Sequence, residues 1–181
     1  MKSVEIVFVP RGDIREMMAS SLPIVAWRQT WLRIVSPSGD AWAVHPAELG
    51  KCEGIYPQDS PVHVISAWNP GSKKLSADEN WHLHAQLLEE LTASKAEIWE
   101  GTGSSHTEDW TEVGIARVGC SLDSSLSIAR RWGQDAIWEW HREGLAVVEC
   151  NSGQRHEWGW ILAALPSRKP FDDLEGLIAA S

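Results

Sequence analysis

Short apolar runs recur along the chain and predict a series of strands. Residues 62–68 are almost continuously apolar, which is typical of a strand covered on both faces. Two further apolar runs, at residues 31–35 and 41–45, flank a loop with Pro37 and Gly39 and predict a hairpin. The other strands are expected at residues 4–9, 96–100, 111–119, 136–140 and 145–150, with a final strand or helix near residues 157–165.

Two segments in the middle of the chain have the periodicity of amphipathic helices. Ser76 and Glu79 form a capping box, in which each side chain satisfies a free backbone N–H, so a helix is predicted from 76 to about 94. A second helix begins at Ser121 or Asp123 and ends before Gly133. The buried stripe expected for the first helix is Trp81, Ala85, Leu88 and Leu91, with Leu87 alongside. Shorter helices are expected at residues 13–20 and at the C-terminal end.

The predicted elements of the middle region follow the order β-α-β-β-α-β-β, which is a split βαβ arrangement. We therefore expect an α/β fold of the α+β type, with a mostly antiparallel open sheet and two helices on one face. With 181 residues and no repeat or long linker, the chain fits one domain with one core. Within that domain, residues 1–61 form an N-terminal elaboration with a β-hairpin, residues 62–150 the core, and residues 151–181 a C-terminal strand or helix extension.

The charge and hydropathy of the chain indicate which kinds of partner are disfavoured and in which compartment the protein resides. The formal net charge of −9 disfavours attraction to nucleic acid or to an anionic membrane surface. No run approaches 18 uninterrupted apolar residues, and the N-terminal strand contains Glu5, unlike the core of a signal peptide. We expect a soluble, cytoplasmic protein. Three widely spaced cysteines, Cys52, Cys120 and Cys150, predict neither a disulfide framework nor a zinc knuckle.

A set of short motifs connects the central region to a known family. These motifs are ISAWNP at residues 65–70, with Ser72, Ser76, Glu79 and Asn80 after it, WTE at 110–112, ARRW at 129–132 and GQDAI at 133–137. Their combination resembles the bacterial family known as domain of unknown function 3293, over about residues 62–150. The sequence departs from the family pattern at Leu83 and His84, where more basic character is expected. Because the family has no established activity, the resemblance implies a shared fold and a shared polar constellation, and no reaction.

Polar and aromatic residues at predicted strand ends and helix starts form the candidate site, because such positions converge on a ligand in folds that alternate strands and helices. The set consists of Trp68, Asn69, Ser72, Glu79, Asn80, Trp110, Glu112 and Gln134. Glu112 and Glu79 are the candidate catalytic pair, dividing acid and base roles, and the others are candidate substrate-binding residues. A structural interpretation competes with this one, since Glu79 is explained by the capping box and Gln134 by bonds to buried backbone. Glu112 has the least complete structural explanation.

No metal site or cofactor is predicted. His82 and His84 are the closest histidines, but residues two apart on a helix point in nearly opposite directions and cannot share one ion. The glycine-rich segment 101–105 looks like a phosphate loop without the lysine of that motif, so we expect a flexible hairpin or lid loop. Twelve tryptophans, against one tyrosine and two phenylalanines, supply large core side chains and candidate stacking surfaces.

Two hypotheses about function stay open from the sequence. The first is a small-molecule-binding or hydrolytic domain with a polar pocket at the strand ends, in which Trp68 or Trp110 stacks on the substrate. The second is a non-enzymatic interaction module, such as a regulator, an antitoxin or a phage-related inhibitor, which binds a protein through its acidic, tryptophan-rich surface. The first requires a concave pocket lined by Glu112 and Asn69, whereas the second requires an exposed apolar patch.

Overall fold

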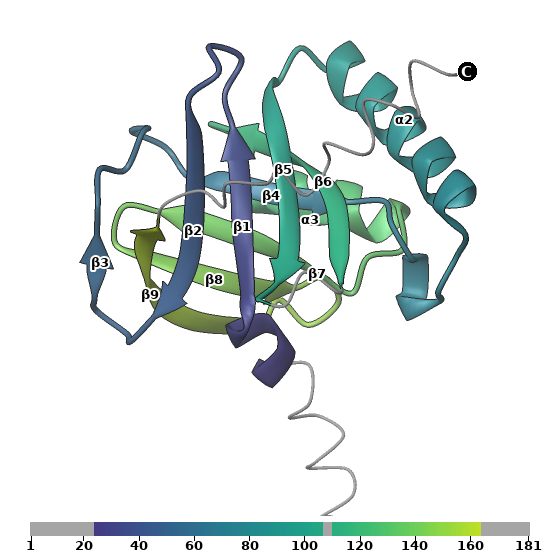
Figure 1. Cartoon of the computed structure of the whole chain (residues 1–181). Helices are drawn as coiled ribbons and strands as arrows, with labels where there is room; N and C mark the ends of the chain where they lie inside the picture. Colours follow the sequence, from purple (N-terminus) through teal and green to yellow (C-terminus); the bar gives the residue numbers. More distant parts are fainter. Residues whose placement is uncertain (1–23, 107–109, 164–181) are drawn as a thin grey trace, which may run out of the picture.

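The computed structural model describes residues 24–106 and 110–163, and Figure 1 shows their arrangement. A short helix at residues 24–28 precedes the first strand. The elements that follow are β1 (Thr30–Val35), β2 (Ala41–Ala47), β3 (Cys52–Glu53), β4 (Val62–Ser66), the single turn η1 (Pro70–Ser72), α2 (Ala77–Ala93), β5 (Glu97–Ser105), β6 (Thr111–Val118), α3 (Leu122–Arg131), β7 (Ala136–His141), β8 (Gly144–Glu149) and β9 (Arg155–Ala163).

Eight of these strands form a closed antiparallel barrel. The strand order is β2-β1-β5-β6-β4-β7-β8-β9, and β2 pairs with β9 to close the ring. The short strand β3 adds to β9 from outside the ring and is the one parallel pairing in the described residues. In Figure 1, β1, β2, β5 and β6 form the near wall, with α2 to one side of it. Closure pairs each of the eight strands on both sides, so none of them is an edge strand.

The prediction of an open α/β sheet is therefore wrong, although the predicted strands and helices of the described residues occur close to their expected places. The error lies in the pairing. The N-terminal hairpin β1–β2 is inserted between β5 and β9, so it closes the barrel instead of decorating a sheet. Pairings between strands so distant in sequence leave no signal in local periodicity, because each strand alternates in the same way in an open or a closed sheet.

The glycine-rich segment 101–105 is also corrected. It is not a loop but the second half of the long strand β5, where it pairs with β1 on one side and β6 on the other. The segment near residues 157–165 is the strand β9. The strand predicted at residues 4–9, the helix at 13–20 and the C-terminal helix lie outside the described residues. Within the described ranges, no helix is both long enough and apolar enough to cross a membrane.

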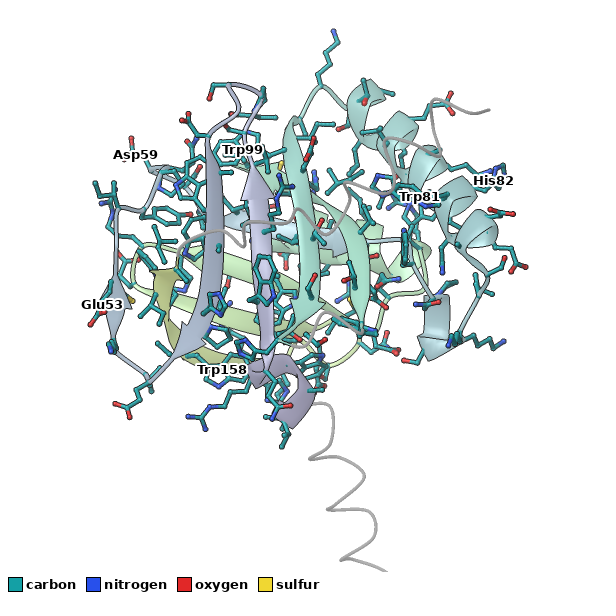
Figure 2. The ribbon with its side chains drawn as sticks, viewed as in Figure 1. Glu53, Asp59, Trp81, His82, Trp99 and Trp158 are labelled. Carbon is teal, nitrogen blue, oxygen red and sulfur yellow. The ribbon has the colours of Figure 1, made fainter. Side chains whose placement is uncertain are left out.

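Alternate residues of each strand point into the barrel and form its inner core. The buried members of this core are Leu32, Ile34, Val44, Tyr56, Val62, Val64, Trp99, Ala116, Val118, Trp140, Leu145 and Trp160. Tyr56 comes from the connection between β3 and β4, and its hydroxyl donates to the backbone oxygens of Ser60 (2.7 Å) and Trp140 (2.9 Å). Figure 2 shows Trp99 near the end of the barrel opposite to Trp158, which lies beside the short helix 24–28.

The opposite residues of β4, β6, β7 and β8 point outward, and the two helices cover them. This second core contains Ile65, Ala67, Leu87, Leu91, Ile115, Leu126, Ile128, Ala129, Ile137, Ala146, Val148 and Cys150. Helix α2 contacts β6, and α3 contacts β4 and β7. The stripe predicted for α2 is partly wrong. Leu87 and Leu91 are fully buried, but Leu88 is 42% exposed and Asn80 is buried instead.

The barrel is filled unevenly along its axis, and this difference positions the site. Large indoles pack together at one end, where Trp42 stacks on Trp99 with ring centroids 5.4 Å apart and Trp140 lies edge-on to Trp160 at 5.6 Å. Toward the other end, the inward positions of β4, β5 and β6 carry the small residues Ser66, Gly101, Gly103 and Gly114. An eight-stranded barrel is just wide enough for its own side chains or for one small ligand. Small residues at this end therefore leave space inside.

Candidate functional site

A cavity of about 760 Å³ occupies the sparsely filled half of the barrel. Its deep wall includes the buried residues Val64, Gly103, Gly114 and Val147, and exposed residues such as Lys74 and Asn151 form its rim. The residues that line it are Trp27, Val64, Ser66, Trp68, Asn69, Ser72, Lys74, Gly103, Trp110, Glu112, Gly114, Gly133, Gln134, Asp135, Ala136, Ile137, Trp138, Val147, Glu149 and Asn151. This volume suits a small organic molecule.

Asn69 follows strand β4 and is held in an unusual backbone conformation. Its φ of 48° and ψ of 51° lie in the left-handed region, which asparagine tolerates better than most residues. Its amide N–H donates to Asn80 Oδ1 at 2.9 Å, and its own Oδ1 accepts from Asn80 Nδ2 at 3.1 Å and from the Leu75 N–H at 3.0 Å. These bonds fix the side chain so that its Nδ2 faces Glu112.

Glu112 enters the cavity from the start of β6, and its Oε1 accepts a hydrogen bond of 3.2 Å from Asn69 Nδ2. Burial raises the pKa of Glu112 above the usual range of a glutamate, and the bond from Asn69 offsets only part of this effect. Burial favours the protonated form because a carboxylate loses hydration in a low-dielectric site. Glu112 is thus a carboxyl group that holds its proton to higher pH than an exposed glutamate and faces a space large enough for a ligand.

We expect Glu112→Gln to raise the free energy of unfolding by about 1 kcal/mol at neutral pH, because the amide removes a poorly hydrated charge and still accepts from Asn69. For a chain of this length the melting temperature rises by roughly 2–4 °C. A raised pKa means that the folded state binds more protons, so wild-type stability falls as pH rises from about 4.5 through the folded pKa. The gain of the variant grows over the same range. Thermal melts at several pH values measure both effects.

Glu79→Gln is the matched control for this experiment. The Ser76 hydroxyl and N–H bond the Glu79 carboxylate and lower its pKa, so this group stabilises the fold above pH 4.5 and the effect is lost as pH falls below that value. The control variant should therefore be less stable than wild type at neutral pH. Equal pH profiles for the two variants contradict the assignment of Glu112 as a desolvated carboxyl group.

The structure brings six of the eight predicted site residues to this one cavity. They are Trp68, Asn69, Ser72, Trp110, Glu112 and Gln134. Gln134 uses its Nε2 to donate to the Trp68 backbone oxygen at 2.9 Å, and Ser72 Oγ donates to Asp135 Oδ2 at 2.7 Å. Both therefore brace the rim of the cavity. Trp110 is 44% exposed at the start of β6, where its indole lies over Gly103.

Glu79 and Asn80 do not line the cavity. Glu79 completes the capping box of α2 with Ser76, as its structural interpretation predicts. Asn80 is 3% exposed and supports Asn69 from behind. The predicted partnership of Glu79 with Glu112 as an acid–base pair is therefore not formed in one cavity.

Two carboxylates outside the predicted set also line the cavity, those of Asp135 and Glu149. Glu149 is the less exposed of the two. It ends β8, and its oxygens lie 2.9 Å from His156 Nε2 and accept from Ser152 Oγ at 2.5 Å. The hydrogen bonds from Ser152 and His156 lower the pKa of Glu149. The sequence signal for Glu149 was the alternation of residues along β8, which places Glu149 on the same inward face as Leu145 and Val147. That signal points to a cavity only when the sheet is known to close.

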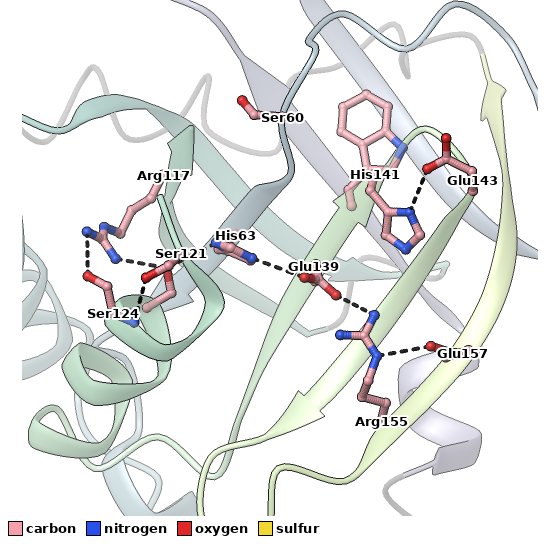
Figure 3. A network of polar contacts seen from close by, with 12 residues as sticks. Ser60, His63, Arg117, Ser121, Ser124, Glu139, His141, Glu143, Arg155 and Glu157 are labelled. Carbon is pink, nitrogen blue, oxygen red and sulfur yellow. Dashed lines mark hydrogen bonds and ion pairs between the residues drawn. The ribbon is translucent and has the colours of Figure 1, made fainter. Parts of the chain in front are cut away.

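A second polar network lies outside the barrel wall, under α3, and Figure 3 shows it. Arg117 donates to Ser125 Oγ at 2.8 Å, Ser125 Oγ lies 3.0 Å from His63 Nδ1, and His63 Nε2 lies 3.2 Å from Glu139 Oε1. Arg155 forms an ion pair with Glu139 at 2.5 Å. The order of serine, histidine and glutamate is that of a hydrolase triad. However, Ser125 is 0% exposed and its oxygen already accepts from Arg117, so it is not available as a nucleophile.

A smaller hollow of about 340 Å³ lies beside this network. Its charged lining residues pair with one another, as Arg155 with Glu139, His141 with Glu143, and Arg142 with Asp59. The hollow therefore offers little unpaired charge to a ligand. Among the described residues, no three His, Cys, Asp or Glu side chains are placed to hold a metal ion together.

Fold and site together define the class of protein: a closed antiparallel β-barrel with two outer helices and a polar, tryptophan-lined cavity in one half of its interior. Residues 65–137 match the family described as protein of unknown function (DUF3293), so the resemblance predicted from the sequence is confirmed. The matched segment runs from β4 to β7 and carries the cavity residues Asn69, Glu112 and Gln134. No curated protein and no solved structure matches the chain.

Proposed function

We propose that this protein binds a small molecule inside the open half of its barrel. The observation that carries the proposal is the cavity of about 760 Å³, in which Glu112, a carboxyl group of raised pKa, is held by Asn69. Pockets that combine an apolar wall with a few oriented polar groups and a perturbed titratable residue are typical of ligand sites. The resemblance to a family without known activity adds no reaction to this reasoning.

The alternative of a protein-interaction module finds less support. It requires a contiguous apolar patch on the surface. The exposed large apolar side chains of the described residues come from five separate segments, and they are Val25, Leu49, Ile55, Leu88 and Trp110. Trp110 is the one among them that lines the cavity. The described surface thus favours a ligand inside the barrel over a partner on its outside.

Substitution of Gly103 by residues of increasing size tests the site. A Cβ at this position meets Thr30 Cγ2 at 3.5 Å and Leu32 and Trp110 at 3.9 Å, which are ordinary contacts. Gly103→Ala should therefore leave ligand binding intact, whereas Gly103→Leu should fill the cavity and abolish it. A ligand found by a thermal-shift screen of metabolites against wild type provides the measurement, because binding to the native state raises the melting temperature.

Two controls distinguish filling of the cavity in Gly103→Leu from a general loss of folding. Circular dichroism must show that Gly103→Leu is folded, and a Glu100→Leu variant places the same side chain on the exposed outward face of the same strand. The proposal predicts loss of the ligand-induced shift in Gly103→Leu alone. Retention of the full shift in that folded variant places the ligand elsewhere and refutes the proposed site.

Hydrolysis of the bound molecule is a second candidate, because two carboxyl groups with oppositely shifted pKa values face one cavity. Burial raises the pKa of Glu112, and hydrogen bonds from Ser152 and His156 lower that of Glu149. In such a pair, the protonated Glu112 donates to a leaving group while the ionised Glu149 accepts a proton from the attacking water. Turnover of chromogenic esters and glycosides that disappears in both Glu112→Gln and Glu149→Gln supports this candidate, and turnover unchanged in both refutes it.

A further inference from the structure

The ionisable groups around the cavity are unbalanced in sign. Three carboxyl groups, Glu112, Asp135 and Glu149, line it, against one ammonium group, that of Lys74. Lys74 and Asp135 are both exposed at the rim, where water screens their charges, so the carboxyl groups that face the interior are those of Glu112 and Glu149. A concave site lined by charge of one sign concentrates that field inside it. The interior of the cavity therefore attracts positive charge.

The polar groups of the cavity wall also differ in how much of their hydrogen-bonding capacity is already taken by neighbouring residues. The side-chain amide of Asn69 donates to Glu112 and that of Gln134 donates to the Trp68 backbone oxygen. The Ser72 hydroxyl donates to Asp135. Within the described residues, these contacts use one oxygen of Glu112 and one of Asp135, and carboxylate oxygens accept several hydrogen bonds each. These two carboxyl groups can therefore accept further hydrogen bonds from a ligand with N–H donors, while the Trp68 indole N–H is an unpartnered donor in the same wall.

Aromatic and apolar side chains complete the environment. Four indoles line the cavity, namely those of Trp27, Trp68, Trp110 and Trp138. The face of an indole is the strongest aromatic partner for a cation. The deeper wall is apolar, with Val64 and Val147 beside Trp138. A ligand that fits these surfaces has an apolar body directed inward and a positively charged head near the carboxylates.

From these three features we infer that the ligand of the barrel cavity is an organic cation, an amine or ammonium compound with an apolar or aromatic body. The inference rests on the proposed function, since it specifies the chemistry of the molecule that the same cavity binds. Cation binding also links to proton release, because a positive charge near Glu112 stabilises its ionised form. Proton release on binding therefore distinguishes a cationic ligand from a neutral one.

The test compares three molecules of nearly the same shape, phenethylammonium, 2-phenylethanol and phenylacetate, by titration calorimetry against the whole protein. Phenethylammonium is expected to bind at least about tenfold more tightly than the neutral alcohol, and phenylacetate more weakly than both. At mildly acidic pH, titrations in buffers of different ionisation enthalpy should show proton release with the cation and none with the alcohol. Higher salt should weaken the binding of phenethylammonium and leave the binding of 2-phenylethanol unchanged.

Variants separate this inference from the proposal of a ligand site. Asp135→Asn and Glu149→Gln should each reduce the preference for the cation several-fold, while Glu157→Gln, an exposed acid that does not line the cavity, should not. If the alcohol binds as well as the cation and both are lost in Gly103→Leu, the cavity is a ligand site and the charge inference is wrong. Absence of phenethylammonium binding to wild type also overturns the inference. Binding of any probe that persists in Gly103→Leu refutes the site itself.

Discussion

Replacing Glu139 with alanine is expected to lower the free energy of unfolding by about 3–5 kcal/mol, because it leaves the buried His63 and the guanidinium of Arg155 without their shared partner. Glu139 is 6% exposed and His63 1% exposed, so water replaces the lost contacts poorly. At this chain length the loss corresponds to a fall in melting temperature of roughly 10 °C. Chemical denaturation at neutral pH measures it.

The same substitution should change how stability depends on pH. Burial acts to raise the pKa of Glu139, but the contacts with His63 and Arg155 outweigh it and lower the pKa to about 2. A lowered pKa means that the stabilisation is complete above the unfolded value of about 4.5 and is lost as pH falls toward 2. The difference between wild type and Glu139→Ala should therefore shrink over that acidic range.

Glu157→Ala is the matched control for Glu139→Ala. Glu157 Oε1 lies 3.0 Å from Nε of the same Arg155, but its side chain is 53% exposed. An exposed pair of this kind contributes about 0–1 kcal/mol. Similar losses in the two variants would show that the network is a surface feature and that burial does not set its strength.

Replacing Gly114 with alanine is the second large effect that we expect, with a loss of about 1–3 kcal/mol or more. A Cβ at this position lies 2.7 Å from the Ile65 backbone oxygen and 3.2 Å from that of Gly101. Both contacts are with backbone atoms of the neighbouring strands, so the barrel wall must move to relieve them. Urea denaturation of the variant against wild type measures the loss.

Gly103→Ala provides the comparison for Gly114→Ala, since both glycines line the same cavity and both lie in strands. At Gly103 the added methyl meets only side chains, at 3.5 Å or more. We expect a change within about 0.5 kcal/mol, as for a substitution that introduces neither a cavity nor a clash. Equal destabilisation by the two substitutions would mean that the crowding at Gly114 is not what fixes the spacing of β4, β5 and β6.

The candidate site was partly predictable because its residues stand at the ends of local elements. Asn69 and Glu112 occupy such positions, and the turn and capping signals around them are properties of short segments. Glu79 shows the limit of this reasoning. Its place at a helix start is correct, but the start of α2 does not open into the cavity. Glu149 was missed for the opposite reason, because nothing in β8 alone shows that its inward face borders an empty space.

The amino-acid sequence by itself determined the local elements of this protein. Capping residues, apolar periodicity and turn residues act over a few positions, so most strands, both long helices and the family resemblance could be predicted from them. The tertiary structure alone decided that β1 and β2 join β5 to β9 and close the sheet. Closure is a contact between distant segments, and it depends on the summed fit of all eight strands. Through closure, small residues on one half of the inner face become a cavity, and that cavity brings Asn69, Glu112 and Glu149 to one space.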